Sequence, residues 1–178
     1  MRKKIALRRG ARFALTCLAL AVLAGCNRPA KTEAAKDPHY DLSPESNARY
    51  LVDFAAKPGV TKTDDGLEYR VIKAGTGKAP QSGADMVTVK YKGALINGKV
   101  FDEHDDAVDA AAGKTATFPA GALIPGWVEA LSLMKEGDKW ELVLPSDLGY
   151  GPEGAGKDIP GNQTLVFEMT LVSVQPAQ

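Results

Sequence analysis

The sequence is poor in the residues on which covalent catalysis and metal binding usually depend. It contains two cysteines and two histidines in 178 residues, and His39 and His104 lie far apart in the chain. Carboxylates crowd residues 102–109, but this loop lacks the spacing and the central glycine of an EF-hand calcium site. No Ser/His/Asp or Cys/His arrangement stands out either. We therefore expect a function that uses no metal and no cofactor.

Basic residues are also scarce once the first segment is set aside. Residues 1–25 carry six of the 22 lysines and arginines and no acidic residue, which leaves 16 basic against 22 acidic residues, a net charge of −6. Such a chain lacks the positive surface that attracts nucleic acid. Residues 151–157 come close to a phosphate-binding loop, but Asp158 stands where that loop needs Ser or Thr, and Pro160 prevents the following helix. The sequence therefore excludes nucleic acids and nucleotides as ligands.

The first 25 residues predict export from the cytoplasm. A basic stretch ends at Arg12, and an apolar run follows from Phe13 to Ala24. A membrane-spanning helix needs about 20 apolar residues, so this run is too short to span a bilayer and fits the apolar part of a secretory signal. Cys17 lies inside the segment, so its removal leaves one cysteine and no disulfide within the chain.

Residues 23–26, Leu-Ala-Gly-Cys, resemble the lipobox of bacterial lipoproteins. The resemblance implies that residues 1–25 are a lipoprotein signal peptide and that Cys26 carries acyl chains that anchor the protein to a membrane. Asn27 stands in place of the aspartate that resembles an inner-membrane retention signal. We therefore expect a lipid-anchored protein of the outer membrane that faces the periplasm. An ordinary signal peptide with a chance cysteine is the alternative.

Composition and spacing divide the rest of the chain into three parts. Ser43-Pro44 is typical of a helix start, and apolar residues at helical spacing predict a helix over residues 44–56. Pro58-Gly59 ends this element. The segment before it is small and polar and predicts a flexible tether. The expected division is therefore a tether at 26–42, a short helix and linker at 43–65, and a folded domain at 66–178.

The folded domain predicts strands around one helix. Alternating apolar residues predict strands at Leu67–Ile72, Val87–Lys92, Thr115–Phe118, Trp140–Leu144 and Leu165–Val174. Asn97-Gly98 between apolar runs predicts a hairpin with a type I′ turn, which needs positive φ at both residues. After Pro125-Gly126 apolar residues recur at helical spacing, and we expect Gly137 to cap this helix. An antiparallel sheet with one central helix is an α+β fold.

Seven short stretches follow one another in an order that resembles the FKBP-type peptidyl-prolyl cis–trans isomerases, in their bacterial periplasmic branch. They are Val89–Gly93, Gly98–Asp102, Leu123–Trp127, Met134–Gly137, Gly149–Gly151, Ile159-Pro160 and Thr164–Phe167. One stretch alone is weak evidence for the family, whereas the whole set in this order is specific to it. The resemblance implies a bent five-stranded antiparallel sheet wrapped around a short central helix, preceded by a short N-terminal helix. It also implies a proline-binding pocket between the helix and the sheet.

The resemblance assigns a role to each pocket residue. The substrate-binding residues would be Trp127 at the floor, Phe101 and Phe167 in the walls, Phe118 and Leu123 at the mouth, and Ile159 in an overhanging loop. The catalytic set would be Tyr91 in a wall, the backbone N–H of Ile124, the hydroxyl of Tyr150 and a buried carboxylate at Asp102. The two hydrogen-bond donors would hold carbonyl groups of the substrate, and the carboxylate would lie near the twisted imide.

A pocket of this kind can isomerise proline peptide bonds without covalent chemistry. Rotation about a peptide C–N bond costs about 18–20 kcal/mol, and X–Pro bonds exchange over tens to hundreds of seconds. The twisted imide is less polar than the planar one, so a water-poor aromatic pocket favours the transition state. The expected substrates are proline-containing unfolded or exported polypeptides. Macrolide inhibitors are a further class of ligand that the resemblance implies.

One feature of the sequence keeps other functions open, an insertion at Ala107–Gly113 close after Asp102. Asp158 stands where small members of the family carry an apolar residue, a difference that bears on macrolide binding and on the preferred residue before proline. The first alternative is a non-catalytic module that binds proline-containing peptides. The second is a holdase chaperone tethered to the membrane, which would need a large exposed apolar patch.

Overall fold

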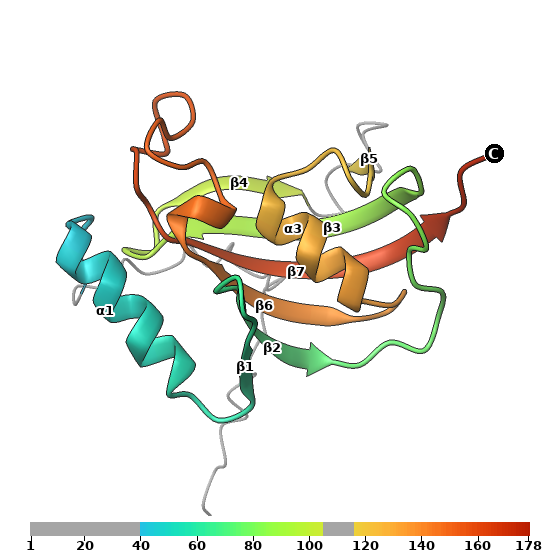
Figure 1. The fold of residues 1–178 in the computed structure, drawn as a ribbon, viewed down its shortest axis with the longest axis horizontal. Coiled ribbons are helices and arrows are strands. Elements are labelled where there is room, and N and C mark those ends of the chain that lie inside the picture. Colours follow the sequence, from blue (N-terminus) through green and yellow to red (C-terminus); the bar gives the residue numbers. More distant parts are fainter. Residues whose placement is uncertain (1–39, 105–115) are drawn as a thin grey trace, which may run out of the picture. The chain divides into compact units, whose positions relative to one another are not determined.

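The computed structural model describes residues 40–104 and 116–178, where helix α3 lies across one face of an antiparallel sheet (Figure 1). In chain order the elements are α1 (Pro44–Ala55), β1 (Val60–Lys62), β2 (Glu68–Lys73), β3 (Met86–Leu95), β4 (Val100–His104), β5 (Thr117–Pro119), α3 (Pro125–Leu133), β6 (Lys139–Leu144), a 3₁₀ turn at Ser146–Leu148, and β7 (Leu165–Gln175). Within these two ranges no helix is long and apolar enough to cross a membrane. The predicted signal peptide, most of the tether and the insertion at 107–113 lie outside the described residues.

The sheet has the predicted α+β architecture, with more strands than expected. The strand order is β1-β2-β6-β7-β3-β4, with β5 paired to β3, and all pairs are antiparallel. Strands β3 and β7 pair along their whole length at the centre, from Met86 opposite Gln175 to Leu95 opposite Leu165. The described residues form seven strands instead of the five that the resemblance implies. The three-residue strand β1 was not predicted, whereas β5 overlaps the predicted strand at Thr115–Phe118.

Helix α3 is fixed by side chains that belong to the main apolar core. Trp127 and Met134 are 5% and 0% exposed, and Ala130 and Leu131 between them are fully buried. They share one apolar cluster with the buried residues of β6 and β7. Burial of a side chain of this size stabilises a fold by about 1.5–3 kcal/mol. Packing of the core therefore determines where Trp127 lies.

The alternation predicted for β2 is wrong at both ends of the strand. Leu67 and Glu68 are neighbours and are both fully buried, whereas Val71 and Ile72 are about half exposed. Helix α1 contacts both β1 and β2. Strand β1 pairs only with residues 68–70, so the end of β2 has no strand on that side. The burial of side chains in β2 therefore does not follow the alternation of apolar residues within the strand.

The hairpin between β3 and β4 forms as predicted, but its turn type differs. Gly98 has a φ of 80°. In the described part of the chain Asn162 is the only residue other than glycine with a positive φ, so Asn97 does not adopt the type I′ geometry. The N–H of Gly98 donates to the carbonyl of Leu95 at 2.8 Å, and the N–H of Leu95 donates to the carbonyl of Lys99 at 2.9 Å. This is the three-residue hairpin loop that needs glycine at its last position only.

Helix α3 ends earlier than predicted. Its last residue is Leu133, and Met134 is already extended, with ψ of 159°. Gly137 has a φ of 91°, but it lies in the next turn, where the N–H of Lys135 donates to the carboxylate of Asp138 at 2.6 Å. Full burial of Met134 in the core accompanies this change of direction.

Helix α1 begins as the sequence predicts. Ser43 is the N-cap, its hydroxyl accepts from the N–H of Ser46 at 3.2 Å, and Pro44 opens the helix. Phe54 is 1% exposed, and α1 belongs to the same compact unit as the sheet. The boundary at residue 66 remains a prediction.

Candidate active site

Four predicted pocket residues form one cluster of perpendicular rings between α3 and the sheet. Trp127 makes edge-to-face contacts with Tyr91, at 4.8 Å between ring centroids and 81°, and with Phe167, at 5.2 Å and 79°. Phe101 contacts Phe167 in the same way, at 5.7 Å and 86°. Edge-to-face contacts are the favoured geometry of aromatic pairs and fix the orientation of each ring. The structure therefore brings together residues from α3, β3, β4 and β7.

A β-bulge explains why Phe101 and Asp102, although adjacent, both meet this cluster. Asp102 pairs with Gly93 and Val100 pairs with Ala94, so Phe101 is an extra residue in β4. A bulge redirects side chains that would otherwise alternate between the two faces of a strand. Phe101 thus packs on Phe167, while Asp102 accepts a hydrogen bond from the Tyr91 hydroxyl at 2.5 Å.

The carboxylate of Asp102 is not buried, which corrects the prediction for this residue. Its side chain is 51% exposed, and its second oxygen accepts from the N–H of Glu103 at 3.0 Å. It lies in the middle of β4, an edge strand of the sheet, and contacts the ring cluster through the Tyr91 hydroxyl. Asp102 can therefore orient the Tyr91 hydroxyl from the rim.

Tyr150 lies in the loop before β7, close enough to Asp102 to be influenced by its charge. The side chain of Tyr150 is 39% exposed. Partial burial raises the pKa of Tyr150 above its ordinary value of 10.0, and the negative charge of Asp102 raises this pKa further. The hydroxyl is therefore protonated and able to donate a hydrogen bond at neutral pH.

The remaining predicted residues surround the cluster. Phe118, Leu123 and Ile124 are half-buried and pack against the same core, and Ile159 is 7% exposed. Ile124 is the N-cap of α3, and its N–H donates to no acceptor among the described residues. A donor in that position is available to a substrate carbonyl. The specific roles of these residues in binding remain predictions.

Two residues of the site were missed by sequence reasoning. A Cβ atom added to Gly93 would lie 2.7 Å from ring atoms of both Phe101 and Phe167, so only glycine lets the two rings approach the strand. Glycine inside a strand is a known sign of such close approach and was the available signal. His104 stacks on Tyr91 at 5.4 Å and 13°, because the two residues pair across β3 and β4. The chain position of His104 gave no hint of this contact.

Asp158 also has a partner that the sequence did not indicate. The ammonium group of Lys99, in the hairpin after β3, lies 2.9 Å from its carboxylate. This ion pair lowers the pKa of Asp158 through the hydrogen bond and the charge of Lys99. It joins the hairpin that leads to Phe101 with the loop that contains Ile159.

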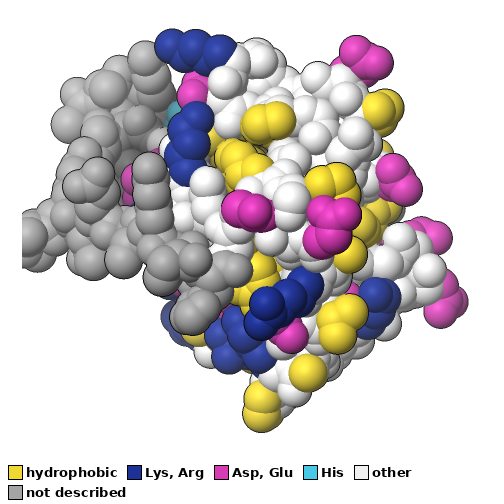
Figure 2. Space-filling view, turned by 90° about the vertical axis from the view of Figure 1, so that its left-hand side faces the viewer, with side chains coloured by type: hydrophobic (Ala, Val, Ile, Leu, Met, Phe, Trp, Pro, Cys, Tyr) yellow, Lys and Arg dark blue, Asp and Glu magenta, His cyan; other side chains and the backbone are white. Residues whose placement is uncertain are grey.

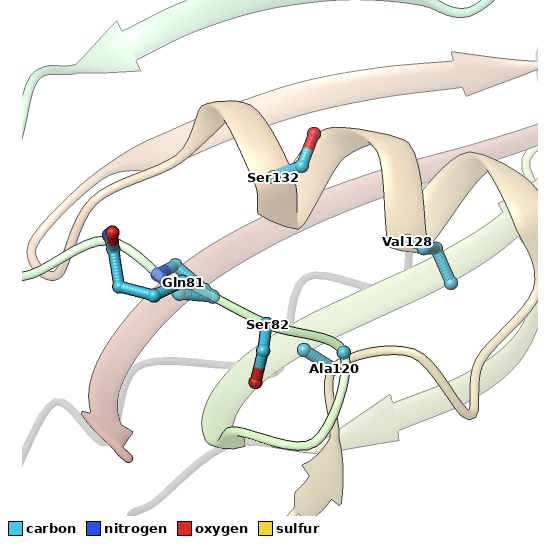
Figure 3. Close-up of a pocket in the computed structure, with 7 residues that line it drawn as sticks. Gln81, Ser82, Ala120, Val128 and Ser132 are labelled. Carbon is cyan, nitrogen blue, oxygen red and sulfur yellow. The ribbon is translucent and has the colours of Figure 1, made fainter. Parts of the chain in front are cut away.

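A separate hollow lies beside α3 (Figure 3). It has a volume of about 240 Å³ and is lined by Pro80, Gln81, Ser82, Gly83, Ala120, Val128 and Ser132. Figure 3 shows α3, which carries Val128 and Ser132, beside the segment with Gln81 and Ser82. No predicted site residue lines this hollow, so it is distinct from the aromatic cluster.

Comparison with known proteins identifies the family of this chain. Residues 77–172 match the family model described as FKBP-type peptidyl-prolyl cis-trans isomerase. The chain is 42% identical over 144 residues to the FKBP-type 22 kDa peptidyl-prolyl cis-trans isomerase of Escherichia coli, covering 81% of this chain and 67% of that protein. It is 48% identical over 122 residues to the outer membrane protein MIP of Legionella longbeachae, covering 68% of this chain and 50% of that protein.

Solved structures give the same result. The crystal structure of FkpA from Escherichia coli has a TM-score of 0.67 at 41% identity and covers 75% of this chain and 60% of that one. A peptidyl-prolyl cis-trans isomerase of Pseudomonas syringae has a TM-score of 0.66 at 36% identity, over 74% of this chain and 92% of that one. The chain spans about half to two thirds of the length of the curated relatives it matches. By sequence and by fold, this chain belongs to the FKBP-type peptidyl-prolyl cis-trans isomerase family.

Proposed function

We propose that this protein accelerates cis–trans isomerisation of X–Pro bonds in exported polypeptides. The observation that carries the proposal is the cluster of perpendicular rings around Trp127, with one hydroxyl donor beside it at Tyr150. Trp127 and Phe167 are 5% and 2% exposed, so the cluster excludes water from their faces. A proline ring bound there loses water around its imide, which favours the twisted and less polar transition state.

The polar groups at the margin suit the same reaction. The N–H of Ile124 and the protonated hydroxyl of Tyr150 are donors for the carbonyl groups that flank the proline. Two fixed donors hold the substrate in a turned geometry and reduce the entropy lost at the transition state. No step breaks a covalent bond, so the site needs neither a nucleophile nor a cofactor. Macrolide ligands would occupy the same aromatic surface.

The proposed place of action is the periplasmic side of the outer membrane, through acyl chains on Cys26. The lipobox-like residues before Cys26 support this, and the relative from Legionella longbeachae is named an outer membrane protein. Mass spectrometry of the purified N-terminal peptide tests the anchor. A diacylglyceryl group on Cys26, lost together with membrane association in Cys26→Ser, is the expected result. An unmodified Cys26 on a membrane-free protein would refute it.

The activity is tested by a protease-coupled assay with proline peptides and by refolding of a protein limited by proline isomerisation. The full-length chain in detergent is compared with Tyr150→Phe and Asp102→Ala. Loss of one hydrogen bond of about 1 kcal/mol predicts a fall in kcat/KM of about fivefold in Tyr150→Phe. Lack of acceleration by the folded wild-type chain, over a range of residues before proline, would contradict the proposal and favour a non-catalytic binding module.

The holdase alternative has less support on the surface that Figure 2 displays. On that face the exposed hydrophobic side chains are interspersed with acidic, basic and other polar groups rather than joined in one large patch. A chaperone that holds unfolded chains requires a contiguous apolar area. Suppression of aggregation without any isomerase activity would reverse this preference.

A further inference from the structure

Helix α1 reaches the loop before β7 through one buried amide, that of Asn47. This side chain is 5% exposed, although asparagine is usually found at the surface. Its Oδ1 accepts from the backbone N–H of Thr164 at 2.7 Å, which fixes the orientation of the amide. Its Nδ2 then donates to the side-chain carbonyl of Gln163 at 3.2 Å and to the carbonyl of Ser43 at 2.9 Å. Both hydrogen-bonding atoms of Asn47 are therefore in use.

Gln163 strengthens the same junction from the other side. It is 7% exposed, and its Nε2 donates to the carbonyl of Leu42 at 3.3 Å and to that of Gly161 at 3.1 Å. The two amides thus join the start of α1 to residues 161–164, which are more than 100 positions away in sequence. Figure 1 shows α1 beginning on the side of the molecule where the chain enters β7.

Residues 161–164 form the C-terminal end of the loop that carries Tyr150 and Ile159. The N–H of Asn162 donates to the carbonyl of Gly151 at 2.9 Å, so the two ends of the loop are joined next to Tyr150. Within the loop, Ala155 and Ile159 exchange two backbone hydrogen bonds, of 2.9 and 3.2 Å. Asn162 holds a φ of 60°, a conformation that asparagine tolerates but that neighbouring contacts must maintain.

We propose that Asn47 is a positioning residue for the isomerase site. Its hydrogen bond from the N–H of Thr164 fixes the C-terminal end of the loop. The loop in turn holds Tyr150 and Ile159 over the ring cluster. Thr164 also opens the segment that leads to Phe167, so the same bond supports one wall of the pocket. The effect of Asn47 on catalysis rests on the proposed function, whereas the fixing of the loop by Asn47 does not.

The test uses the full-length chain in detergent with three substitutions. Asn47→Ala removes the hydrogen bond from Thr164 and the hydrogen bonds to Gln163 and Ser43. Asn47→Asp keeps an oxygen that accepts from Thr164 but loses the amide donor. Phe54→Leu is the control, because Phe54 is buried at the other end of α1 and forms no hydrogen bond to the loop. Each variant is measured for kcat/KM, for the midpoint of unfolding, and for amide hydrogen exchange at Ala155 and Ile159.

Asn47→Ala is expected to accelerate exchange at Ala155 and Ile159 and to lower kcat/KM by about tenfold, since small displacements of binding groups have large effects on rate. Asn47→Asp should lie between this variant and the wild type. Phe54→Leu should lower the unfolding midpoint while exchange in the loop and kcat/KM remain at wild-type values.

Two results would overturn the proposal. The first is a lower unfolding midpoint in Asn47→Ala with unchanged loop exchange and unchanged kcat/KM, which is a purely structural role. The second is the same loss of activity and loop protection in Phe54→Leu as in Asn47→Ala. If Asn47→Ala does not fold, Asn47→Asp decides by the same measurements. An inactive wild type refutes the proposed function. Amide hydrogen exchange at Ala155 and Ile159 then decides by itself whether Asn47 fixes the loop.

Discussion

Replacement of Gly93 by alanine should damage the pocket from the side of the sheet. The added Cβ atom would lie 2.7 Å from Cε2 and Cζ of Phe101 and 2.7 Å from Cε1 of Phe167. Carbon atoms approach favourably at about 3.5–4.0 Å, so each ring must move by roughly 1 Å. Overpacking of this kind destabilises a fold by about 1–3 kcal/mol. Both rings belong to the cluster around Trp127, so the substrate surface moves with them.

A displacement of about 1 Å in a binding group can lower activity up to about 100-fold. We therefore expect kcat/KM of Gly93→Ala to fall at least tenfold in the protease-coupled assay, at a temperature where the variant is folded. Gly77→Ala is a matched control, because its Cβ would lie 2.5 Å from Cβ of Glu136, outside the ring cluster. This control should lose stability and keep its activity. Wild-type kcat/KM in a folded Gly93→Ala would refute the assignment of these rings to the substrate surface.

Three further predictions concern charge. The activity should be constant from about pH 6 to 9, because burial and the charge of a nearby carboxylate raise the pKa of Tyr150 above 10.0; a loss centred near pH 8 would contradict its role as donor. Lys62→Ala should lower the free energy of unfolding by about 1–3 kcal/mol in urea titrations, because it removes the partner of the fully buried carboxylate of Glu68; no change would show that the carboxylate finds another donor. Hydrogen bonds from the N–H groups of Ala177 and Gln81 hold the pKa of Asp85 below 3.8, so this stabilisation is present above about pH 4 and is lost as the pH falls through the lower folded value. Asp85→Asn should accordingly weaken the acid dependence of the unfolding midpoint, and an unaltered dependence would contradict the argument.

Local signals in the sequence predicted most of the fold. Ser43 and Pro44 placed the start of α1 because capping depends on residues that are adjacent in the chain. The alternation of β3 matched its burial because both faces of that strand have the expected neighbours. The pattern of β2 failed in a strand that α1 contacts and that β1, from elsewhere in the chain, pairs with only at residues 68–70. Spacing within a strand contains no information about such contacts.

The site was predicted unevenly for a similar reason. The resemblance gave the identities of Tyr91, Phe101, Trp127 and Phe167, which the structure brings together. It did not give the bulge at Phe101, which depends on the register between β3 and β4. The exposure of Asp102 follows from that register and from the position of β4 at the edge of the sheet. Long-range contacts such as that between Lys99 and Asp158 cannot be read from a single sequence.

The pocket divides into a part that the core determines and a part that loops determine. The rings of Tyr91, Trp127 and Phe167 orient one another and are buried in the main apolar cluster, so their arrangement cannot change without disturbing the fold. Asp158 and its partner Lys99 are nearly half exposed, and an exposed ion pair contributes little to stability. Substitutions in the ring cluster should therefore change the rate for every proline substrate. Substitutions at Asp158 or Lys99 should instead change which residues near the proline are preferred, because these charges act on the substrate at the loop and leave the imide environment intact.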